Sequence, residues 1–166
     1  MVTTTNEITQ KELKLKLNYY KDNGIFVWNG KKGFNVAGYT RPDGYVFIRI
    51  NNKLYRAHRL AWLFEYGEFP KNEIDHIDGN PNNNSILNLR LSNSSQNKCN
   101  TKLRKDNTSG VKGLHWYKAY QKWQVNISFN KKAKCLGYFD DLFEACCKIY
   151  SARNQLHKEF ANHGYH

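Results

Sequence analysis

The sequence predicts an α+β fold. A β-rich N-terminal region leads into two short strands and a helix, and a three-stranded antiparallel sheet packed on one helix follows. Two kinds of periodicity support this fold class: residues 122–129 alternate as a half-buried strand does, whereas Ala57, Leu60, Ala61 and Phe64 recur at helical spacing. Between the two halves, residues 101–109 are polar, basic and weakly periodic, which is typical of a linker.

The N-terminal region, 1–56, is predicted to contain one helix and three strands. Thr9 and Glu12 fit a capping box for a helix near 9–20, with Leu13, Leu17 and Tyr20 at helical spacing. Glycine- and asparagine-containing turns divide the rest into short apolar runs. The predicted strands are 24–28, 34–39 and 45–50, and a turn at 51–53 leads into residues 54–56. The residue types of this region assign no chemistry to it.

The middle of the chain alternates short strands with helices. The helix that carries the Ala57 stripe should end at Gly67 and Pro70. A strand is then predicted at 73–77, a loop at 79–84, a second strand at 87–91 and a polar helix at 92–100. Beyond the linker, strands are predicted at 111–116, 122–129 and 133–138, followed by a final helix capped by Asp140 or Asp141. Its inner stripe consists of Leu142, Ala145, Cys146, Ile149, Ala152 and Leu156.

The charge balance indicates a polyanionic partner. The chain has 26 basic and 14 acidic residues, a net charge of +12. Residues 98–166 hold 13 basic and 5 acidic residues, against 13 and 9 in residues 1–97. Such an excess suits nucleic acid or an acidic membrane surface. No stretch approaches the roughly 20 apolar residues that a spanning helix needs, and the polar N-terminus lacks a signal sequence, so no membrane role and a cytoplasmic location are expected.

The four cysteines do not form a zinc motif. Cys99, Cys135, Cys146 and Cys147 show no C-x-x-C spacing. We therefore interpret them as reduced thiols, some of them small core residues.

The segment with the most chemical information is Asp75-His76, followed by Asn88 and Asn97. An isolated Asp-His would be an ordinary polar pair at a loop edge. Here the chain returns in a second short strand and enters a helix that offers Asn97. Asp78 and the following asparagines superficially suggest a calcium loop, but the EF-hand needs a glutamate where this chain has Leu89.

These residues resemble the HNH endonuclease family and its ββα-metal motif, over roughly 55–102. The spacing from His76 to Asn88 and from Asn88 to Asn97 is similar to that of its phage homing-endonuclease branch. The resemblance implies that Asp75 and Asn97 ligate one divalent cation, Mg²⁺ or Mn²⁺, because their oxygens are hard ligands. It implies that His76 is the general base, and that Asn88 braces the loop that orients His76.

Three further residues near the motif have both functional and structural interpretations. His58 lies where the family often has a histidine, so it supports the site, touches phosphate or simply packs beside the motif. Arg56 and Arg59 contact the phosphate backbone of DNA or remain solvated charges.

Residues 108–162 resemble the ethylene-response-factor (APETALA-type) DNA-binding domain, on Ser109–Trp116, Lys122–Val125, Leu136–Asp140 and the closing helix. That family places a three-stranded sheet in the major groove, which is about 12 Å wide. The resemblance implies groove-facing residues at Lys112, His115, Trp116, Lys118, Lys122, Trp123, Lys132 and Lys134. The alternative interpretation of Trp123 is that it packs in the core. The alternative for the Lys131-Lys132 turn is that its lysines are simply solvated. This chain lacks the arginines of the plant strands, so no sequence preference is carried over.

Together these observations predict three parts: a leader, 1–56; a nuclease, 57–104; and a DNA-binding domain, 105–166. The expected function is metal-dependent cutting of double-stranded DNA, in the cytoplasm of the bacterial host if a phage encodes the chain. A monomer with one site would nick one strand, and a homodimer would cut both. The alternatives are a DNA-binding regulator with an inactive nuclease fold, and an RNA-binding protein.

Overall fold

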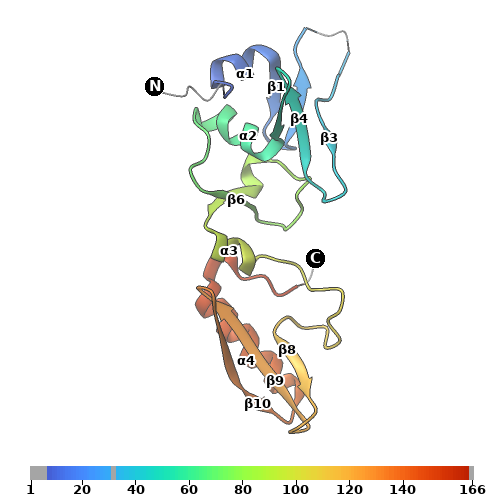
Figure 1. Cartoon of the computed structure of the whole chain (residues 1–166), viewed down its shortest axis with the longest axis vertical. Coiled ribbons are helices and arrows are strands. Elements are labelled where there is room, and N and C mark those ends of the chain that lie inside the picture. Colours follow the sequence, from blue (N-terminus) through green and yellow to red (C-terminus); the bar gives the residue numbers. More distant parts are fainter. Residues whose placement is uncertain (1–6, 31–32, 165–166) are drawn as a thin grey trace. The chain divides into compact units, whose positions relative to one another are not determined.

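The structure is a computed structural model, and it describes residues 7–30 and 33–164. The chain divides into two compact units, residues 1–91 and residues 92–166 (Figure 1). These bounds differ from the three parts predicted from the sequence. The difference has a physical reason, because the predicted leader and the strands that follow it share one apolar core.

The first unit consists of short helices and strands, and its last strand, β7, ends one residue beyond the unit. Its elements are α1 (Gln10–Lys16), β1 (Leu17–Tyr20), β2 (Ile25–Trp28), β3 (Tyr39–Thr40), β4 (Val46–Ile50), β5 (Lys53–Arg56), α2 (Ala57–Tyr66), β6 (Glu73–His76), the 3-10 turn η1 (Ile86–Asn88) and β7 (Leu89–Ser92). The strands form three small sheets: β1 with β2, β3-β4-β5, and β6 with β7. Leu13, Leu17, Ile48 and Leu60 are fully buried in the shared core.

The helix predicted at 9–20 is correct at its start and wrong at its end. Thr9 and Glu12 form the predicted capping box. The helix ends at Lys16, and residues 17–20 pair antiparallel with 25–28 instead. Tyr20 therefore lies on a strand. The strand predicted at 34–39 is also corrected: within the described part of this segment, Val36 makes an isolated bridge to Val27, and β3 begins only at Tyr39.

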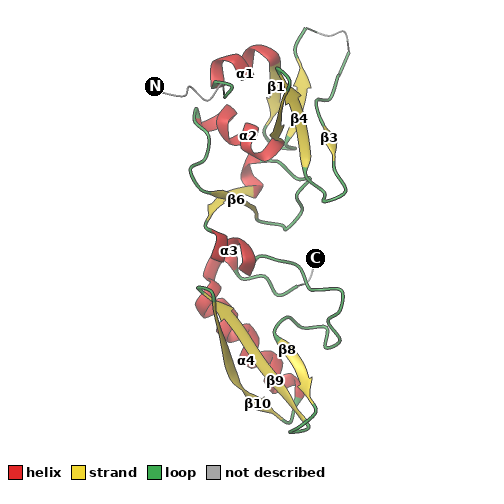
Figure 2. Ribbon diagram, in the orientation of Figure 1, coloured by secondary structure: helices red, strands yellow, loops and turns green. Residues whose placement is uncertain are grey.

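The second unit is a three-stranded antiparallel sheet covered by one helix, as predicted (Figure 2). It contains α3 (Ser94–Cys99), β8 (Leu114–Tyr117), β9 (Lys122–Phe129), β10 (Lys132–Phe139), α4 (Leu142–His157) and the 3-10 turn η2 (Lys158–Phe160). The strand order is β10-β9-β8, and β8 begins three residues later than predicted. Val125 and Ile127 pack against Ala145 and Ile149 of α4. Asp141 caps α4 through Glu144 N–H.

The C-terminal segment of the second unit holds the end of α3. The Asn162 side-chain amide donates to the Asn100 carbonyl at 3.1 Å and to Asn100 Oδ1 at 2.9 Å. Lys112 Nζ donates to the Cys99 carbonyl at 3.1 Å and to the Thr101 carbonyl at 2.5 Å. These bonds join α3 to the sheet-and-helix body of its own unit.

No helix among the described residues is long and apolar enough to cross a membrane.

Candidate active site

Asp75 and His76 are the last two residues of β6, and both are buried. Their exposed fractions are 4% and 6%. Successive strand residues point to opposite faces of a strand, and the two side chains meet different partners accordingly. Asp75 contacts β7, whereas His76 contacts α2 and the loop that follows β6.

Asp75 is neutralised by Arg90 of the paired strand β7. Arg90 Nη2 lies 2.7 Å from Asp75 Oδ2, and Arg90 Nε donates to the same oxygen at 2.8 Å. A buried carboxylate without a charged partner would be costly to desolvate. The Arg90 guanidinium therefore offsets the cost of burying the Asp75 carboxylate. Sequence reasoning missed Arg90, although a cation two strand positions after Asn88 was a signal that it shares a sheet with Asp75.

His76 is held as a neutral imidazole. Its Nε2 lies 3.5 Å from Asn84 Oδ1, and its ring centroid is 5.1 Å from that of His58 and 5.9 Å from that of Tyr45. Burial lowers the pKa of His76, although Asn84 and the charges of Asp78 and Asp75 oppose the shift. An amide oxygen only accepts, so the Asn84 contact favours the tautomer with the proton on Nε2. Nδ1 then carries the lone pair that a general base needs.

His58 lies in the first turn of α2, buried against His76. The two rings meet edge to face at 86°. Burial lowers the pKa of His58 to about 3, and the charges of His76, Arg56 and Arg59 add to the shift. Of its predicted roles, packing beside the motif has direct structural support. Its contact with phosphate stays a prediction.

The two arginines beside His58 contact aromatic rings. The Arg56 guanidinium lies 5.0 Å from the centre of the Tyr45 ring. Arg59 Nη2 donates to the Pro70 carbonyl at 3.0 Å, and this bond joins α2 to the segment that leads into β6. Arg59 therefore has a structural contact in addition to its predicted role at phosphate.

Asn88 joins the two ends of the loop between β6 and β7. Its Oδ1 accepts from Asp78 N–H at 3.0 Å, and its Nδ2 donates to Asp78 Oδ1 and the Asn83 carbonyl, both at 2.9 Å. Burial opposes ionisation of Asp78, but amide hydrogen bonds from Asn80, Asn83 and Asn88 outweigh it and lower the pKa of Asp78. The asparagines that superficially suggested a calcium loop thus hold one another and Asp78. The loop is fixed by its own side chains.

The N-terminal strands support this loop directly. Tyr19 Oη donates to the Asn84 carbonyl at 2.8 Å, and Ile86 N–H donates to the Lys21 carbonyl at 3.1 Å. Gly24 has a φ of +72°, and a Cβ at this position would lie 2.3 Å from the Asn84 carbonyl carbon. Only glycine fits such a position. The region to which residue types assigned no chemistry therefore positions Asn84, which contacts His76.

The HNH endonuclease family model matches residues 55–99. Protein 3.8 of Escherichia phage T7 is 41% identical over 110 residues, which cover 66% of this chain and 90% of that protein. This chain belongs to the HNH endonuclease family. No solved structure gave a significant match.

HNH nucleases generally use a divalent metal, and the predicted ligands fit one chemically. Asp75 supplies a carboxylate and Asn97 an amide oxygen, and Mg²⁺ is commonly held by one or two such groups with water completing its shell. In the part of the chain that the structure describes, no three His, Cys, Asp or Glu side chains group as a metal site. The predicted pair would therefore bind a cation through one carboxylate and the amide oxygen of Asn97. Asn97 lies on α3, in the second unit. Its role as a ligand stays a prediction.

The residues predicted to face the DNA groove are distributed over both sides of the sheet and one loop. Paired residues on neighbouring strands share a side. His115, Gln124 and Tyr138 are paired in this way on the side away from α4, as are Tyr117 and Lys122; we call this side the open face. Lys118 lies in the β8–β9 turn. The other side carries the helix-packed residues Val125 and Ile127.

Five of the predicted residues do not lie on the open face. Trp116 pairs with Trp123, and the centroids of their rings are 5.1 Å apart. The Trp123 ring packs against the core under α4. Lys132 and Lys134 pair with Phe129 and Ile127 on the helix side. Lys112 is bonded to the end of α3, and burial lowers its pKa to about 8 with a contribution from Arg153. DNA contact by these residues stays a prediction.

The open face also carries aromatic residues that sequence reasoning missed. Tyr117, Tyr120 and Tyr138 form a cluster with 5.0–5.5 Å between ring centroids, and Gln124 Nε2 donates to Tyr138 Oη at 2.9 Å. The signal in the sequence was the alternation along β9, where Lys122 and Gln124 fall on the side opposite to the buried Val125 and Ile127. This alternation indicates which positions of the sheet face away from the helix.

Proposed function

We propose that this chain is a divalent-metal-dependent DNA endonuclease that hydrolyses phosphodiester bonds through the residues at the end of β6. Membership of the HNH endonuclease family implies action on DNA. The observation that carries the proposal for this chain is the environment of His76: a buried imidazole with a lowered pKa, beside a buried and charge-paired Asp75. A neutral imidazole is the form of histidine that accepts a proton.

In this mechanism His76 Nδ1 takes a proton from the attacking water. The Asn84 contact keeps the other ring proton on Nε2, and the His58 and Tyr45 rings limit rotation of the imidazole. Because the pKa of His76 is lowered, the base is available at neutral pH without prior loss of a proton.

Asp75 and Asn97 would hold the cation, which neutralises charge on the scissile phosphate and helps the 3′ oxygen to leave. Arg90 orients the Asp75 carboxylate through Oδ2. Asn88 acts through the loop rather than on substrate, because its amide is occupied by Asp78 and Asn83. Such supporting residues fix the geometry of the groups that react.

The second unit would choose where the site acts. It holds 13 basic and 5 acidic residues, and it has the three-stranded antiparallel sheet and covering helix that the resemblance to the ethylene-response-factor domain implies. His115, Lys118 and Lys122 on or beside the open face are the first candidates for DNA contact. Cations supply the affinity for phosphate, while side chains that reach base edges supply sequence preference.

One site per chain means that a monomer would nick one strand and a homodimer would cut both. By analogy with a phage relative, the chain would act in the cytoplasm of a bacterial host. A DNA-binding regulator with an inactive nuclease fold is the second candidate. The contact that favours it is Arg90, which already occupies Asp75 Oδ2.

A gel assay separates these functions. Supercoiled plasmid and a structured RNA are each incubated with the full chain, with magnesium, with manganese and with a chelator. The proposal predicts nicked or linear plasmid only with metal, and intact RNA. Retarded but uncut plasmid under all conditions would favour the regulator, and metal-dependent RNA breakdown in preference to DNA would contradict both.

A further inference from the structure

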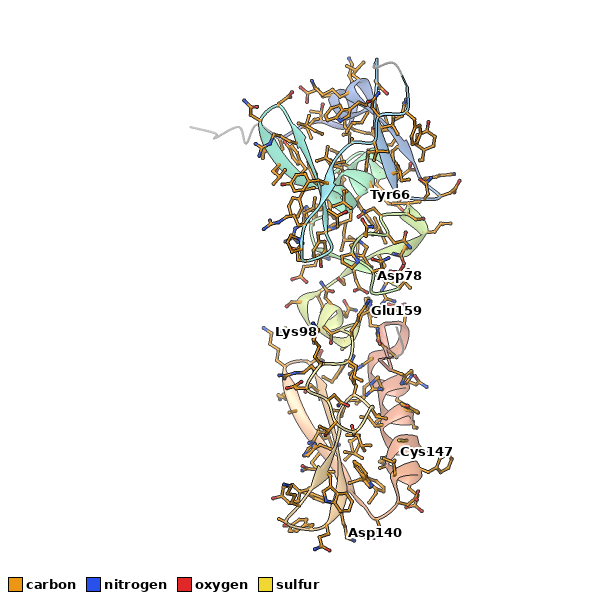
Figure 3. The ribbon with its side chains drawn as sticks, turned by 90° about the vertical axis from the view of Figure 1, so that its right-hand side faces the viewer. Tyr66, Asp78, Lys98, Asp140, Cys147 and Glu159 are labelled. Carbon is orange, nitrogen blue, oxygen red and sulfur yellow. The ribbon has the colours of Figure 1, made fainter. Side chains whose placement is uncertain are left out.

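The second unit contains a cavity lined by cations at the end of the sheet nearest α3. Its volume is about 730 Å³, and α3, β9, the β9–β10 turn and α4 form its walls. We call it the basic cavity. Its lining includes five cationic residues and no acid: Lys98, Arg104, Lys112, Lys131 and Arg153. Lys98 and Asp140 mark opposite ends of this unit (Figure 3).

The cations of the cavity differ in their availability. Lys112 and Arg153 are occupied within the protein, since Lys112 Nζ donates to backbone carbonyls and Arg153 Nη2 donates to the Lys112 carbonyl at 2.6 Å. Arg104 pairs with Asp106 at 3.1 Å. Lys98 and Lys131 are exposed and have no ion pair among the described residues. The occupied cations still contribute positive potential, and the exposed pair can contact a ligand.

The aromatic part of the wall is formed by His157 and Phe129. Their rings are stacked at 23°, with 6.1 Å between centroids. His157 is 9% exposed; its Nε2 bonds the Ser128 carbonyl at 3.0 Å, and its Nδ1 is buried without a hydrogen-bond partner in the described structure. Burial lowers the pKa of His157; the Ser128 bond opposes this, and the charges of Arg153, Lys112 and His163 add to it. The cavity therefore combines positive potential, an aromatic surface and an unused polar atom.

From this combination we propose that the basic cavity binds one nucleotide of a DNA strand, with the phosphate at Lys98 and Lys131 and the sugar or base against Phe129. A cavity of this size lies within the roughly 300–1,000 Å³ of small-ligand sites, and stacking on aromatic rings beside cations is how proteins hold nucleotides without reading sequence.

The proposal rests on the proposed endonuclease function, because Lys98 directly follows the predicted ligand Asn97 on α3. A strand held at Lys98 and Lys131 would be gripped at the helix that carries Asn97. The cavity lies where β9 meets α3 and α4, and its lining does not include His115, Lys118 or Lys122 of the open face and its turn.

The test compares two charge reversals in the full chain, Lys131→Glu and Lys148→Glu. Both variants replace one lysine by glutamate, so they have the same net charge. Lys148 is an exposed residue of α4 that does not line the cavity. Binding of a fluorescein-labelled duplex is measured by anisotropy with a chelator over a range of salt. We expect Lys131→Glu to weaken binding about tenfold and to reduce the salt slope by about 1, and Lys148→Glu to change neither appreciably. Equal effects of the two variants would overturn the proposal.

A second measurement identifies the ligand and does not depend on cleavage. Thymidine 5′-monophosphate, thymidine and inorganic phosphate are titrated into the full chain, and the NMR signals of Phe129, Lys131 and His157 are followed. Larger shifts with the nucleotide than with either fragment support the proposal. Equal shifts with inorganic phosphate, or shifts confined to open-face residues such as His115, would contradict it. A chain that binds the nucleotide but never cuts DNA would contradict only the proposed nuclease function.

Discussion

The two units of this protein differ in where their proposed functional residues lie. In the first unit the residues of the proposed active site are buried: Asp75, His76 and Asn84 are almost fully enclosed, and the unit has 13 basic and 9 acidic residues. The second unit has the same number of basic residues with only 5 acidic ones, and most of its lysines are exposed. Burial fixes the protonation state and orientation of a few groups, which suits bond cleavage. Exposed cations attract phosphate over a distance, which suits capture of DNA.

The largest expected effect follows from removing the proposed base in the buried unit. His76→Ala should lower the single-turnover rate of DNA cleavage by about 10²–10⁴-fold, the usual contribution of a general base. The matched control is His58→Gln, which changes the neighbouring buried imidazole. It should lose much less activity, because His58 contacts His76 without a proposed proton-transfer role. Quenched-flow or gel time courses give the rate, and full activity of His76→Ala would refute its assignment as the base.

The exposed unit gives a smaller effect on a different quantity. Replacement of His115, Lys118 and Lys122 by alanine should weaken duplex binding about tenfold, while cleavage at saturating DNA stays near the parent value. The double variant Lys132→Ala, Lys134→Ala also removes two lysine charges, but from the helix side of β10. Anisotropy at several salt concentrations compares the two. A greater loss from the helix-side pair would mean that the open face is not the DNA-binding face.

Acid should destabilise the first unit through its histidines. The pKa of His58 is about 3 in the folded chain and about 6.5 when unfolded, so the unfolded state binds more protons between these values. Stability is therefore complete above about pH 6.5 and is lost as the pH falls below it, by up to about 1.4 kcal/mol per pH unit. Urea unfolding at pH 7.5, 6 and 5 measures the slope. His58→Gln should flatten it, and an unchanged slope would show that His58 is not the titrating group.

The smallest effect concerns the support of the loop by the N-terminal strands. Tyr19→Phe removes the hydrogen bond to the Asn84 carbonyl and should cost about 0.5–1.5 kcal/mol of unfolding free energy. Tyr66→Phe is the control, because the Tyr66 ring is exposed and its contact with Trp62 does not use the hydroxyl. Urea unfolding compares the two variants. A cost as small as that of Tyr66→Phe would mean that the Tyr19 bond does not support the loop.

Local patterns predicted more of the fold than of the site. The capping box at Thr9 and the alternation along β9 depend on neighbouring residues, and both appear in the structure. The predicted end of α1 was wrong because an apolar residue such as Leu17 suits a buried position in a helix or in a strand. Its pairing with Trp28 places it on a strand, where it is fully buried. Asn88 was singled out by its resemblance to a family motif, whereas Arg90 and Tyr19 contact Asp75 and Asn84 through strand pairing and tertiary packing. Contacts of that kind leave little trace in a single sequence.

The most direct test of the division of labour uses Asp75→Asn, which preserves size and removes the charge. One labelled duplex serves for two measurements on the variant and the parent: Kd with a chelator, and the cleavage rate constant with magnesium at saturating protein. Our account predicts a rate at least about 10²-fold lower, with Kd within about twofold of the parent value. Asp22→Asn, an exposed change in the same unit, should alter neither. An Asp75→Asn protein that cuts at the parent rate but binds DNA poorly would contradict the account.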